Sequence, residues 1–419
     1  MRVLWKCNIP LPEIALKENV TKSNAGGWLD GLYQKMKVDS SIELGICFPC
    51  EKELKGNING VEYYSFIPKG NGKKDIKEMK EKFKEIISEF QPDMIHIFGT
   101  EYSHTYALVE AYGKRERTLI QIQGLVSVYA NHYMAGVPIK TQLGLYPKDL
   151  YYWDMLVVQR ENFKKQGIWE CAAIKNVMHI IGRTDWDRAC VEQINQNANY
   201  YSCNENLREC FYEDEWSADN IQPHSIFVSQ CSYPIKGLHH VLIAAGILKE
   251  QYGDIQVITT GENFLEKKNY KKTAYQRYLS ELIRENNLEE NVCFMGSLSD
   301  VEMKEMYLKS NVFVSASSIE NSSNSIGEAM LLGVPVISSY VGGIANLLRN
   351  GEEGILYQPD APYMLAYYIR QLFEDADLAK RMSKAARKRA FQTHDRDRNV
   401  MRTIDIYNKI MLGNYDAEN

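Results

Sequence analysis

Short apolar, β-branched runs alternate with amphipathic stretches along the chain, which indicates an α/β protein. The apolar runs predict strands at 1–7, 42–46, 63–67, 92–99, 118–123, 225–230, 255–260, 292–295, 311–318, 334–338 and 354–357. The amphipathic stretches predict helices at 28–36, 73–90, 238–248, 274–287, 325–332 and 396–411. A further strand begins at Ile180 and gives way to a helix near Thr184, a suitable N-cap. Residues 8–25 are predicted to form a long loop.

The stretch 311–343, NVFVSASSIENSSNSIGEAMLLGVPVISSYVGG, predicts a strand, a polar loop, a short helix and a second strand. Glu320 follows the first strand, and Glu328 lies about one turn into the helix. The free amides at a helix N-terminus attract anions, so this corner is suited to a phosphate. On local grounds alone, Ser325 and Glu328 could instead form a capping box, with Glu320 as a solvated loop acid.

The length of 419 residues favours two domains of about 200 residues each. Residues 203–223 contain many acids, show no clear period and end in Pro223, and we interpret them as the region that links the domains. The predicted fold is therefore two Rossmann-like, doubly wound domains over 1–218 and 219–395, each with a parallel sheet.

Charge and apolar content exclude some classes of partner and location. The chain has 49 Lys and Arg against 54 Asp and Glu, a net charge of −5, so no nucleic-acid partner is expected. No apolar run is long enough to span a bilayer, and MRVLWKCNIP lacks a signal-peptide core, so a cytoplasmic location is expected. The nine cysteines fit reduced thiols. Cys47 and Cys50 have redox spacing, but no nearby second pair completes a zinc site, which favours ordinary thiols.

Glu320-x7-Glu328, followed by AMLLGVPVISSYVGGI, resembles the E-x7-E motif of the retaining group 1 glycosyltransferases of family 4. That family has the GT-B fold, in which two Rossmann-like domains face a central cleft. The resemblance implies that 1–218 is the acceptor-side domain, that 219–395 binds the nucleotide-sugar donor, and that 396–419 holds a terminal helix that crosses back to the first domain.

The resemblance also implies roles for individual residues. Glu320 would lie against the donor sugar and Glu328 would hold the ribose hydroxyls, while Lys236, before Gly237, matches a lysine that contacts the diphosphate. The predicted catalytic residues are Glu320 and Lys236. The predicted donor-binding residues are Gly26, Gly27, Arg183, Lys236, Met295, Ser323, Asn324, Ser325 and Glu328.

Two positions depart from the family pattern. Gln123 stands where many members have a histidine, and because glutamine cannot take a proton it can only hydrogen-bond the sugar or shape the acceptor pocket. Cys231 stands where the family usually has an arginine for the diphosphate, and Arg183 is the candidate that compensates. His96 and Gln123 are placed on the acceptor side, because ligands bind beyond the carboxyl ends of parallel strands.

The tyrosine-rich segment 125–154 allows two interpretations. Aromatic rings suit both sugars and lipid headgroups, so the segment is read as the acceptor side with a peripheral contact to the inner face of a membrane. Plain core packing is the alternative explanation for most of these residues.

The resemblance to family 4 implies a retaining glycosyltransferase that moves a hexosyl-type sugar from a nucleotide-diphosphate sugar to a hydroxyl of a saccharide or lipid-linked acceptor, in cell-surface polysaccharide assembly. No carboxylate base stands out in the first domain, so attack on the same face, assisted by the departing phosphate, fits better than inversion. No Asp-x-Asp site is evident, so no metal and no cofactor are expected. A GT-B sugar-nucleotide epimerase and a non-catalytic nucleotide-sugar-binding protein are the alternatives.

Overall fold

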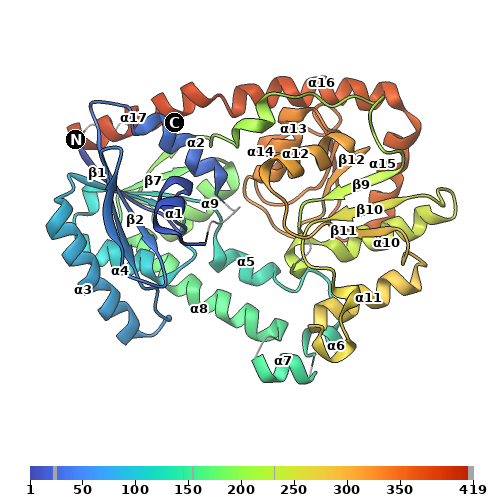
Figure 1. Ribbon diagram of the computed structural model, residues 1–419, viewed down its shortest axis with the longest axis horizontal. Coiled ribbons are helices and arrows are strands. Elements are labelled where there is room, and N and C mark those ends of the chain that lie inside the picture. Colours follow the sequence, from blue (N-terminus) through green and yellow to red (C-terminus); the bar gives the residue numbers. More distant parts are fainter. Residues whose placement is uncertain (22–25, 145, 153–154, 231, 414–419) are drawn as a thin grey trace. The chain divides into compact units, whose positions relative to one another are not determined.

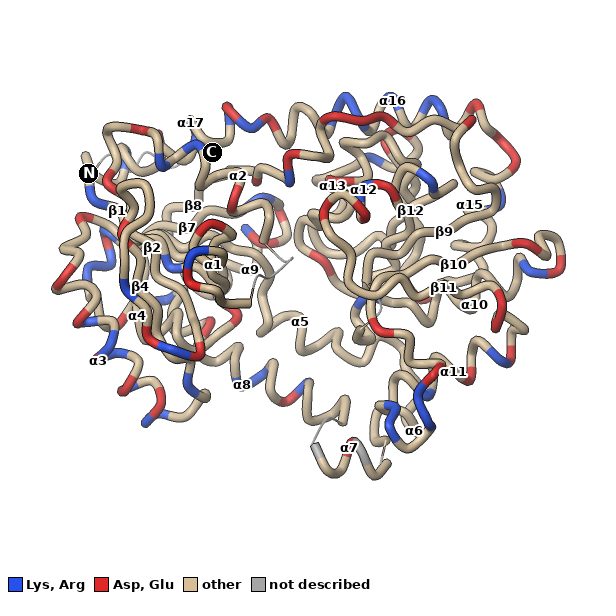
Figure 2. The backbone as a smooth tube through the Cα atoms, viewed as in Figure 1, with Lys and Arg blue, Asp and Glu red and all other residues tan. Residues whose placement is uncertain are grey.

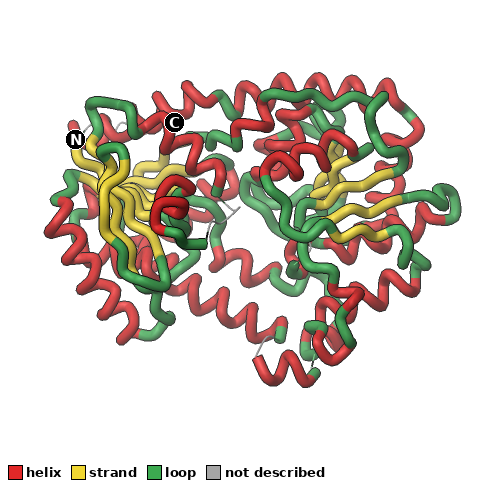
Figure 3. Tube along the Cα trace, viewed as in Figure 1, coloured by secondary structure: helices red, strands yellow, loops and turns green. Residues whose placement is uncertain are grey.

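The computed structural model describes residues 1–21, 26–144, 146–152, 155–230 and 232–413, which form two compact units (Figure 1). The first unit comprises Met1–Tyr129, Phe163–Arg208 and His394–Asn419, and the second comprises Ala130–Asn162 and Glu209–Thr393. Each unit contains one predominantly parallel sheet and its helices (Figure 3), so the predicted α/β class is confirmed. The units divide the chain differently from the predicted ranges, because residues 130–162 pack with the second unit.

The sheet of the first unit has eight strands in the order β3-β4-β2-β1-β5-β6-β7-β8, parallel except for the β3–β4 pair. Its strands are β1 (Arg2–Lys6), β2 (Glu43–Pro49), β3 (Lys55–Ile58), β4 (Val61–Phe66), β5 (Met94–Phe98), β6 (Thr118–Gln121), β7 (His179–Gly182) and β8 (Asn199–Ser202). The strand order reverses between β1 and β5, and ligands bind at such a switch point in open α/β sheets.

Both faces of this sheet are buried. Along β1, Val3 and Trp5 pack into one apolar cluster, whereas Leu4 packs into the cluster on the other face, as the alternation of side chains along a strand requires. The helices of this unit are α1 (Pro12–Glu18), α2 (Gly27–Met36), α3 (Lys73–Phe90), α4 (Ser103–Tyr112), α9 (Asp185–Ile194) and α17 (Arg396–Leu412). Tyr407 of α17 is fully buried and accepts a hydrogen bond from the Trp5 indole at 2.9 Å, so α17 completes the core of the first unit.

The sheet of the second unit has six parallel strands in the order β11-β10-β9-β12-β13-β14. Its strands are β9 (Ser225–Val228), β10 (Gln256–Thr259), β11 (Val292–Phe294), β12 (Val312–Ser315), β13 (Val336–Ser339) and β14 (Ile355–Tyr357). This is the doubly wound order of a Rossmann sheet, whose switch point lies between β9 and β12.

Nine α-helices among the described residues lie wholly within the second unit. They are α6 (Ile139–Gln142), α7 (Pro147–Tyr152), α10 (Leu238–Lys249), α11 (Ala274–Glu285), α12 (Asp300–Lys309), α13 (Asn324–Leu332), α14 (Ile344–Leu347), α15 (Pro362–Glu374) and α16 (Ala376–Thr393). Two helices, α5 (Val126–His132) and α8 (Leu156–Lys175), contain residues of both units. Within the described parts of the chain, no helix has both the length and the apolar character needed to cross a bilayer.

The structure adds elements that the sequence pattern did not predict. Residues 8–25 contain helix α1, with Pro12 at a first-turn position where proline is tolerated. Strand β3 pairs with β4 through Asn59 and Gly60, which both have positive φ. An Asn-Gly pair between two short strands is a strong hairpin signal, so the sequence did carry this information.

Candidate functional site

Two of the predicted residues meet at the switch point of the second sheet. The one-turn helix η3 (Pro234–Lys236) follows β9, and the loop that carries Glu320 follows β12. Because β9 and β12 are neighbours, these connections are adjacent, and Lys236 Nζ lies 2.8 Å from Glu320 Oε2. Ser317 Oγ donates a second hydrogen bond to the same oxygen, at 3.2 Å.

The pair of Lys236 and Glu320 is partly buried, with side-chain exposures of 23% and 12%. Burial alone would lower the pKa of Lys236, but the adjacent Glu320 carboxylate outweighs this and raises the pKa above the ordinary lysine range. Lys236 therefore carries a permanent positive charge at neutral pH, in a place where solvent screens it only partly.

Two glycines allow the backbone to approach closely around this pair. A Cβ on Gly237, whose φ is +72°, would lie 1.9 Å from the carbonyl oxygen of Ala316. A Cβ on Gly342, whose φ is +51°, would lie 1.9 Å from the carbonyl oxygen of Glu320 itself. Both positions therefore need glycine for space as well as for conformation. Gly342 belongs to the quoted motif, but the motif alone did not reveal this role.

Helix α13 begins four residues after Glu320 and carries the second glutamate. Ser323 is its N-cap residue, and among the described residues the Ser323 side chain makes no capping hydrogen bond. Asn324 and Ser325 form the first turn, and Glu328 is in the second, only 6% exposed. The helix starts one residue earlier than predicted, so Ser325 is not a capping residue and the capping-box alternative is wrong.

Met295 directly follows β11, so it too lies at the carboxyl edge of the second sheet. Its amide donates to the Thr259 carbonyl at 2.9 Å, and its side chain is 40% exposed. The adjacent Gly296 and Gly261 exchange backbone hydrogen bonds. The structure thus brings Met295, Lys236, Glu320 and the N-terminus of α13 to one edge of one sheet.

In the first unit, Gly26 is the N-cap of α2 and has a φ of +91°, as expected for a glycine pair that opens a helix. A Cβ on Gly27 would lie 2.4 Å from Cγ of Arg208, so the space above this glycine is filled by another side chain. The predicted contact of the pair with the donor stays a prediction.

Arg183 corrects one prediction. Its guanidinium pairs with Glu205 at 2.7 Å, and both side chains are almost wholly buried. The same Glu205 carboxylate accepts hydrogen bonds from Gln121 at 3.0 Å and from Gln123 at 2.5 Å. Arg183 is therefore held inside the first unit and is not available as a replacement diphosphate clamp. Gln123 is partly exposed beside it, which leaves its predicted place near an acceptor a prediction.

This assignment predicts the effect of Arg183→Met. Removing one partner of a buried ion pair leaves an uncompensated charge and should lower the free energy of unfolding by about 3 kcal/mol. Urea-induced unfolding should show this loss, and Arg183→Met combined with Glu205→Gln should recover part of it. The matched control Arg188→Met removes an exposed arginine whose pair with Glu192 should be worth at most about 0.5 kcal/mol. If Arg183 instead bound the diphosphate, Arg183→Met should have the unfolding free energy of the wild type and should bind the nucleotide more weakly.

His96 corrects a second prediction. It lies within β5 rather than at its end, is fully buried, and its Nδ1 is 2.6 Å from the Tyr407 hydroxyl. Burial lowers the pKa of His96 to about 3. His96 is therefore a neutral residue of the core and does not face an acceptor.

A polar cluster at the switch point of the first sheet escaped the sequence analysis. Lys6, at the end of β1, is fully buried and donates to Asn8 at 2.5 Å and to Thr105 at 3.0 Å. Asn8 in turn donates to Glu101 at 2.9 Å. Burial lowers the pKa of Lys6 to about 8. The only available signal was a lysine at the end of an apolar run.

Two cysteines bear on earlier predictions. Burial raises the pKa of the Cys47 thiol far above its usual range, the opposite of what a redox-active thiol requires. Cys231, the position that departs from the family arginine, lies outside the described residues.

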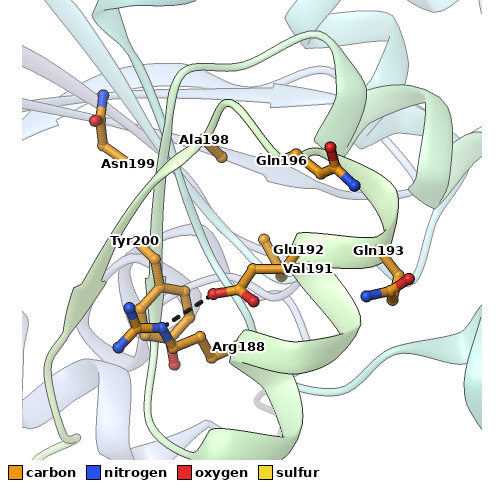
Figure 4. A pocket seen from close by; sticks show the side chains of 8 residues that line it. All are labelled: Arg188, Val191, Glu192, Gln193, Gln196, Ala198, Asn199 and Tyr200. Carbon is orange, nitrogen blue, oxygen red and sulfur yellow. Dashed lines mark hydrogen bonds and ion pairs between the residues drawn. The ribbon is translucent and has the colours of Figure 1, made fainter. Parts of the chain in front are cut away.

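A separate hollow of about 330 Å³ lies between α9 and β8 in the first unit (Figure 4). Gln193, Gln196 and Asn199 line it, and the pair of Arg188 and Glu192 closes one side at 3.2 Å. None of the predicted site residues is among its lining residues, so it is not part of the site described above.

Comparisons with known proteins bear on both units. Residues 212–389 match the family model described as "Glycosyl transferases group 1". EpsD of Bacillus subtilis (strain 168), a protein classed as a glycosyltransferase, is 24% identical over 337 residues, which cover 79% of this chain and 80% of EpsD. Sucrose-phosphate synthase from Thermosynechococcus elongatus superposes with a TM-score of 0.72 over 99% of this chain and 100% of its own, at 15% identity.

HepE from Anabaena, solved in complex with UDP-glucose, superposes with a TM-score of 0.68 over 98% of this chain and 100% of its own, also at 15% identity. At this identity the two solved structures establish the fold and nothing more. The predicted GT-B fold is thereby confirmed.

Proposed function

We propose that this chain, whose residues 212–389 match the family model of the group 1 glycosyltransferases, transfers a hexosyl-type sugar, with retention, from a nucleotide-diphosphate sugar to an acceptor hydroxyl. The observation that carries the proposal is the pair of Lys236 and Glu320 at the switch point of the second sheet, beside the N-terminus of α13. A fixed cation and a helix N-terminus both favour a diphosphate there.

The donor is held by groups with distinct tasks. Lys236 and the amides around Ser323, Asn324 and Ser325 stabilise the diphosphate. Glu328, buried one turn further along α13, accepts hydrogen bonds from the ribose hydroxyls. Met295 lies beside the nucleobase, which the loop holds largely through backbone groups. The UDP-glucose complex of HepE supports UDP-sugars as the first donors to test.

The reaction breaks the bond between the anomeric carbon and the diphosphate oxygen, and the electron pair leaves with the phosphate. The acceptor oxygen forms its bond to the same face of the anomeric carbon, and its proton passes to the departing phosphate oxygen. Lys236 and the α13 dipole stabilise the growing negative charge. Glu320 holds sugar hydroxyls and faces the positive charge on the sugar ring. The charge of Lys236 takes the place of a divalent metal, so the transfer proceeds without one.

The acceptor is a saccharide or a lipid-linked saccharide, used in assembling a cell-surface polysaccharide at the inner face of a membrane. Gln123, which cannot act as a proton carrier, hydrogen-bonds this acceptor. The resemblance to family 4 supports this part of the proposal.

Glu328→Ala is expected to weaken nucleotide binding. Loss of the hydrogen bonds between a carboxylate and two ribose hydroxyls should cost about 2–3 kcal/mol, roughly a hundredfold in affinity. The measurement is the shift in melting temperature of each protein with UDP-, GDP- and ADP-sugars in the absence of metal, together with slow donor hydrolysis. The matched control is Glu353→Ala, which removes another buried glutamate of the second unit, one that pairs with Arg349.

One nucleotide should stabilise the wild type and Glu353→Ala but not Glu328→Ala. An equal response of both variants would contradict the ribose contact. Binding without donor consumption, even when acceptors are present, would favour a non-catalytic binding protein. Donor consumption without a transfer product would favour an epimerase.

A further inference from the structure

Exposed apolar side chains gather on one part of the second unit. Among the described residues between 139 and 151, the exposed large apolar side chains are Ile139, Leu143, Tyr146, Leu150 and Tyr151, and Tyr270 is also exposed. Ile139 is 71% exposed and Tyr151 is 78% exposed. Helices α6 and α7 carry or flank the first group, and α7 lies against the one-turn helix η5 (Asn269–Lys271), which contains Tyr270. We call residues 138–144, 146–152 and 268–272 the α6–α7 platform.

The α6–α7 platform is anchored by one buried arginine. Arg277 of α11 lies 2.6 Å from Asp149 of α7, and this carboxylate is fully buried. The Arg277 guanidinium also stacks on the Tyr146 ring, 3.2 Å from its centroid, and donates to the carbonyls of Asn269 and Lys272. The Arg277 side chain thus contacts α7, Tyr146 just before α7, and the η5 region.

Other contacts place α6 against α11 in the same way. A Cβ on Gly144 would lie 2.4 Å from the Ala274 Cβ, so the chain passes very close to the start of α11. Lys140 pairs with Glu281 at 3.1 Å. The segment that displays the apolar side chains of the platform therefore packs on α11, and a cluster of this kind marks a surface that contacts a partner.

The charge of the platform indicates the partner. The platform contains five Lys and one Asp, in a chain whose net charge is −5. Figure 2 shows basic positions, in blue, around α6. Lys268 and Lys271 are exposed on either side of Tyr270. Apolar and aromatic side chains bordered by lysines match the boundary between acyl chains and anionic headgroups.

We propose that the α6–α7 platform docks this protein on an anionic lipid bilayer. The platform inserts Ile139, Leu143, Leu150, Tyr151 and Tyr270 at the level of the headgroups, and Lys268 and Lys271 pair with anionic headgroups. This inference rests on the proposed function and assigns its membrane contact to one surface. An enzyme docked in this way would reach a lipid-linked acceptor without a membrane-spanning helix.

Vesicle co-sedimentation tests the platform. The full chain should bind vesicles of 70% phosphatidylcholine and 30% phosphatidylglycerol, and it should bind pure phosphatidylcholine at least tenfold more weakly. Ile139→Ser combined with Leu150→Ser should lower affinity for the mixed vesicles at least tenfold. The matched control is Ile168→Ser combined with Leu16→Ser, which removes the same two residue types from exposed positions of the first unit. An equal loss in the control, or no binding by the wild type, would overturn the proposal.

Substitution of two exposed lysines of the platform provides a second test. Lys268→Gln combined with Lys271→Gln should weaken binding to the mixed vesicles about thirtyfold and reduce its salt dependence, because each lysine near an anionic surface contributes about 1 kcal/mol. The control Lys74→Gln combined with Lys77→Gln removes two exposed lysines of α3. Unchanged binding in the platform variant would contradict the proposed role of the lysines.

Two further measurements separate this proposal from its rivals. All platform variants should keep the wild-type melting shift with nucleotide sugar, so a failure of vesicle binding is distinguishable from a failure of donor binding. Light scattering after gel filtration should give the same mass for wild type and variants. A dimer that the Ile139 and Leu150 substitutions dissociate would show that a second copy covers the platform, and would overturn the bilayer assignment.

Discussion

Lys236→Met is expected to lower kcat of sugar transfer by two to three orders of magnitude. Lys236 lies 2.8 Å from Glu320 and is charged at neutral pH, because the carboxylate keeps its pKa high. Removing a preorganised charge that stabilises a departing phosphate costs about 3–4 kcal/mol of transition-state stabilisation. The measurement is steady-state transfer from the nucleotide sugar identified by the melting screen, with kcat and KM determined separately.

Controls distinguish this loss from a folding defect. Lys236→Met leaves Glu320 without its cation, which by itself lowers stability. Lys236→Met combined with Glu320→Gln should recover the melting temperature but not the activity. Lys309→Met, at an exposed lysine of α12, should leave both unchanged. Recovery of activity in the double variant would show that the pair acts only in folding.

Gly237→Ala is expected to destabilise the second unit far more than Gly351→Ala. Both glycines have positive φ, +72° and +80°, so both substitutions carry the conformational cost of about 1–2 kcal/mol. A Cβ on Gly351 meets nothing within 4 Å, whereas a Cβ on Gly237 would lie 1.9 Å from the Ala316 carbonyl oxygen. Because the new Cβ would push β12 and η3 apart, Gly237→Ala should lose about 2 kcal/mol or more of stability in addition to the conformational cost. The loop would then carry Lys236 away from Glu320.

The cost of a side chain at positive φ is common to both variants. The difference between their melting temperatures in differential scanning calorimetry therefore reports the steric clash at Gly237. Donor binding should be lost in Gly237→Ala and kept in Gly351→Ala. Equal melting temperatures for the two variants would show that the close approach of Gly237 to Ala316 relaxes without cost.

The sequence predicted most of the second unit because its signals are local. The strand, loop, helix and strand over 311–343 follow one another within the chain, and the structure has them as β12, α13 and β13. The sequence predicts a loop over residues 8–25, where Pro10 and Pro12 occur, but Pro12 occupies the first turn of α1, where proline is tolerated. Strand β3 was missed because the Asn59-Gly60 turn signal was not used.

The side chains of the first unit were harder to predict, because their partners lie far away in the sequence. Arg183 was read as a donor clamp from its place after a strand, but Glu205 neutralises it inside the fold. His96 was read as facing the acceptor, but Tyr407 holds it from a helix more than 300 residues later. A strand-end position indicates where a backbone lies, and only the packed structure shows which side chains are already engaged.

The contact of Tyr407 with Trp5 and His96 has a consequence for the order in which the protein is made. The N-terminal sheet leaves the ribosome first, yet its core lacks Tyr407 until α17 has been synthesised. The second unit contains no residue beyond Thr393, so its core can close before that of the first unit. Trp5 of β1 therefore lacks a partner that is synthesised 402 residues later, and until then the apolar surface that Tyr407 covers stays open.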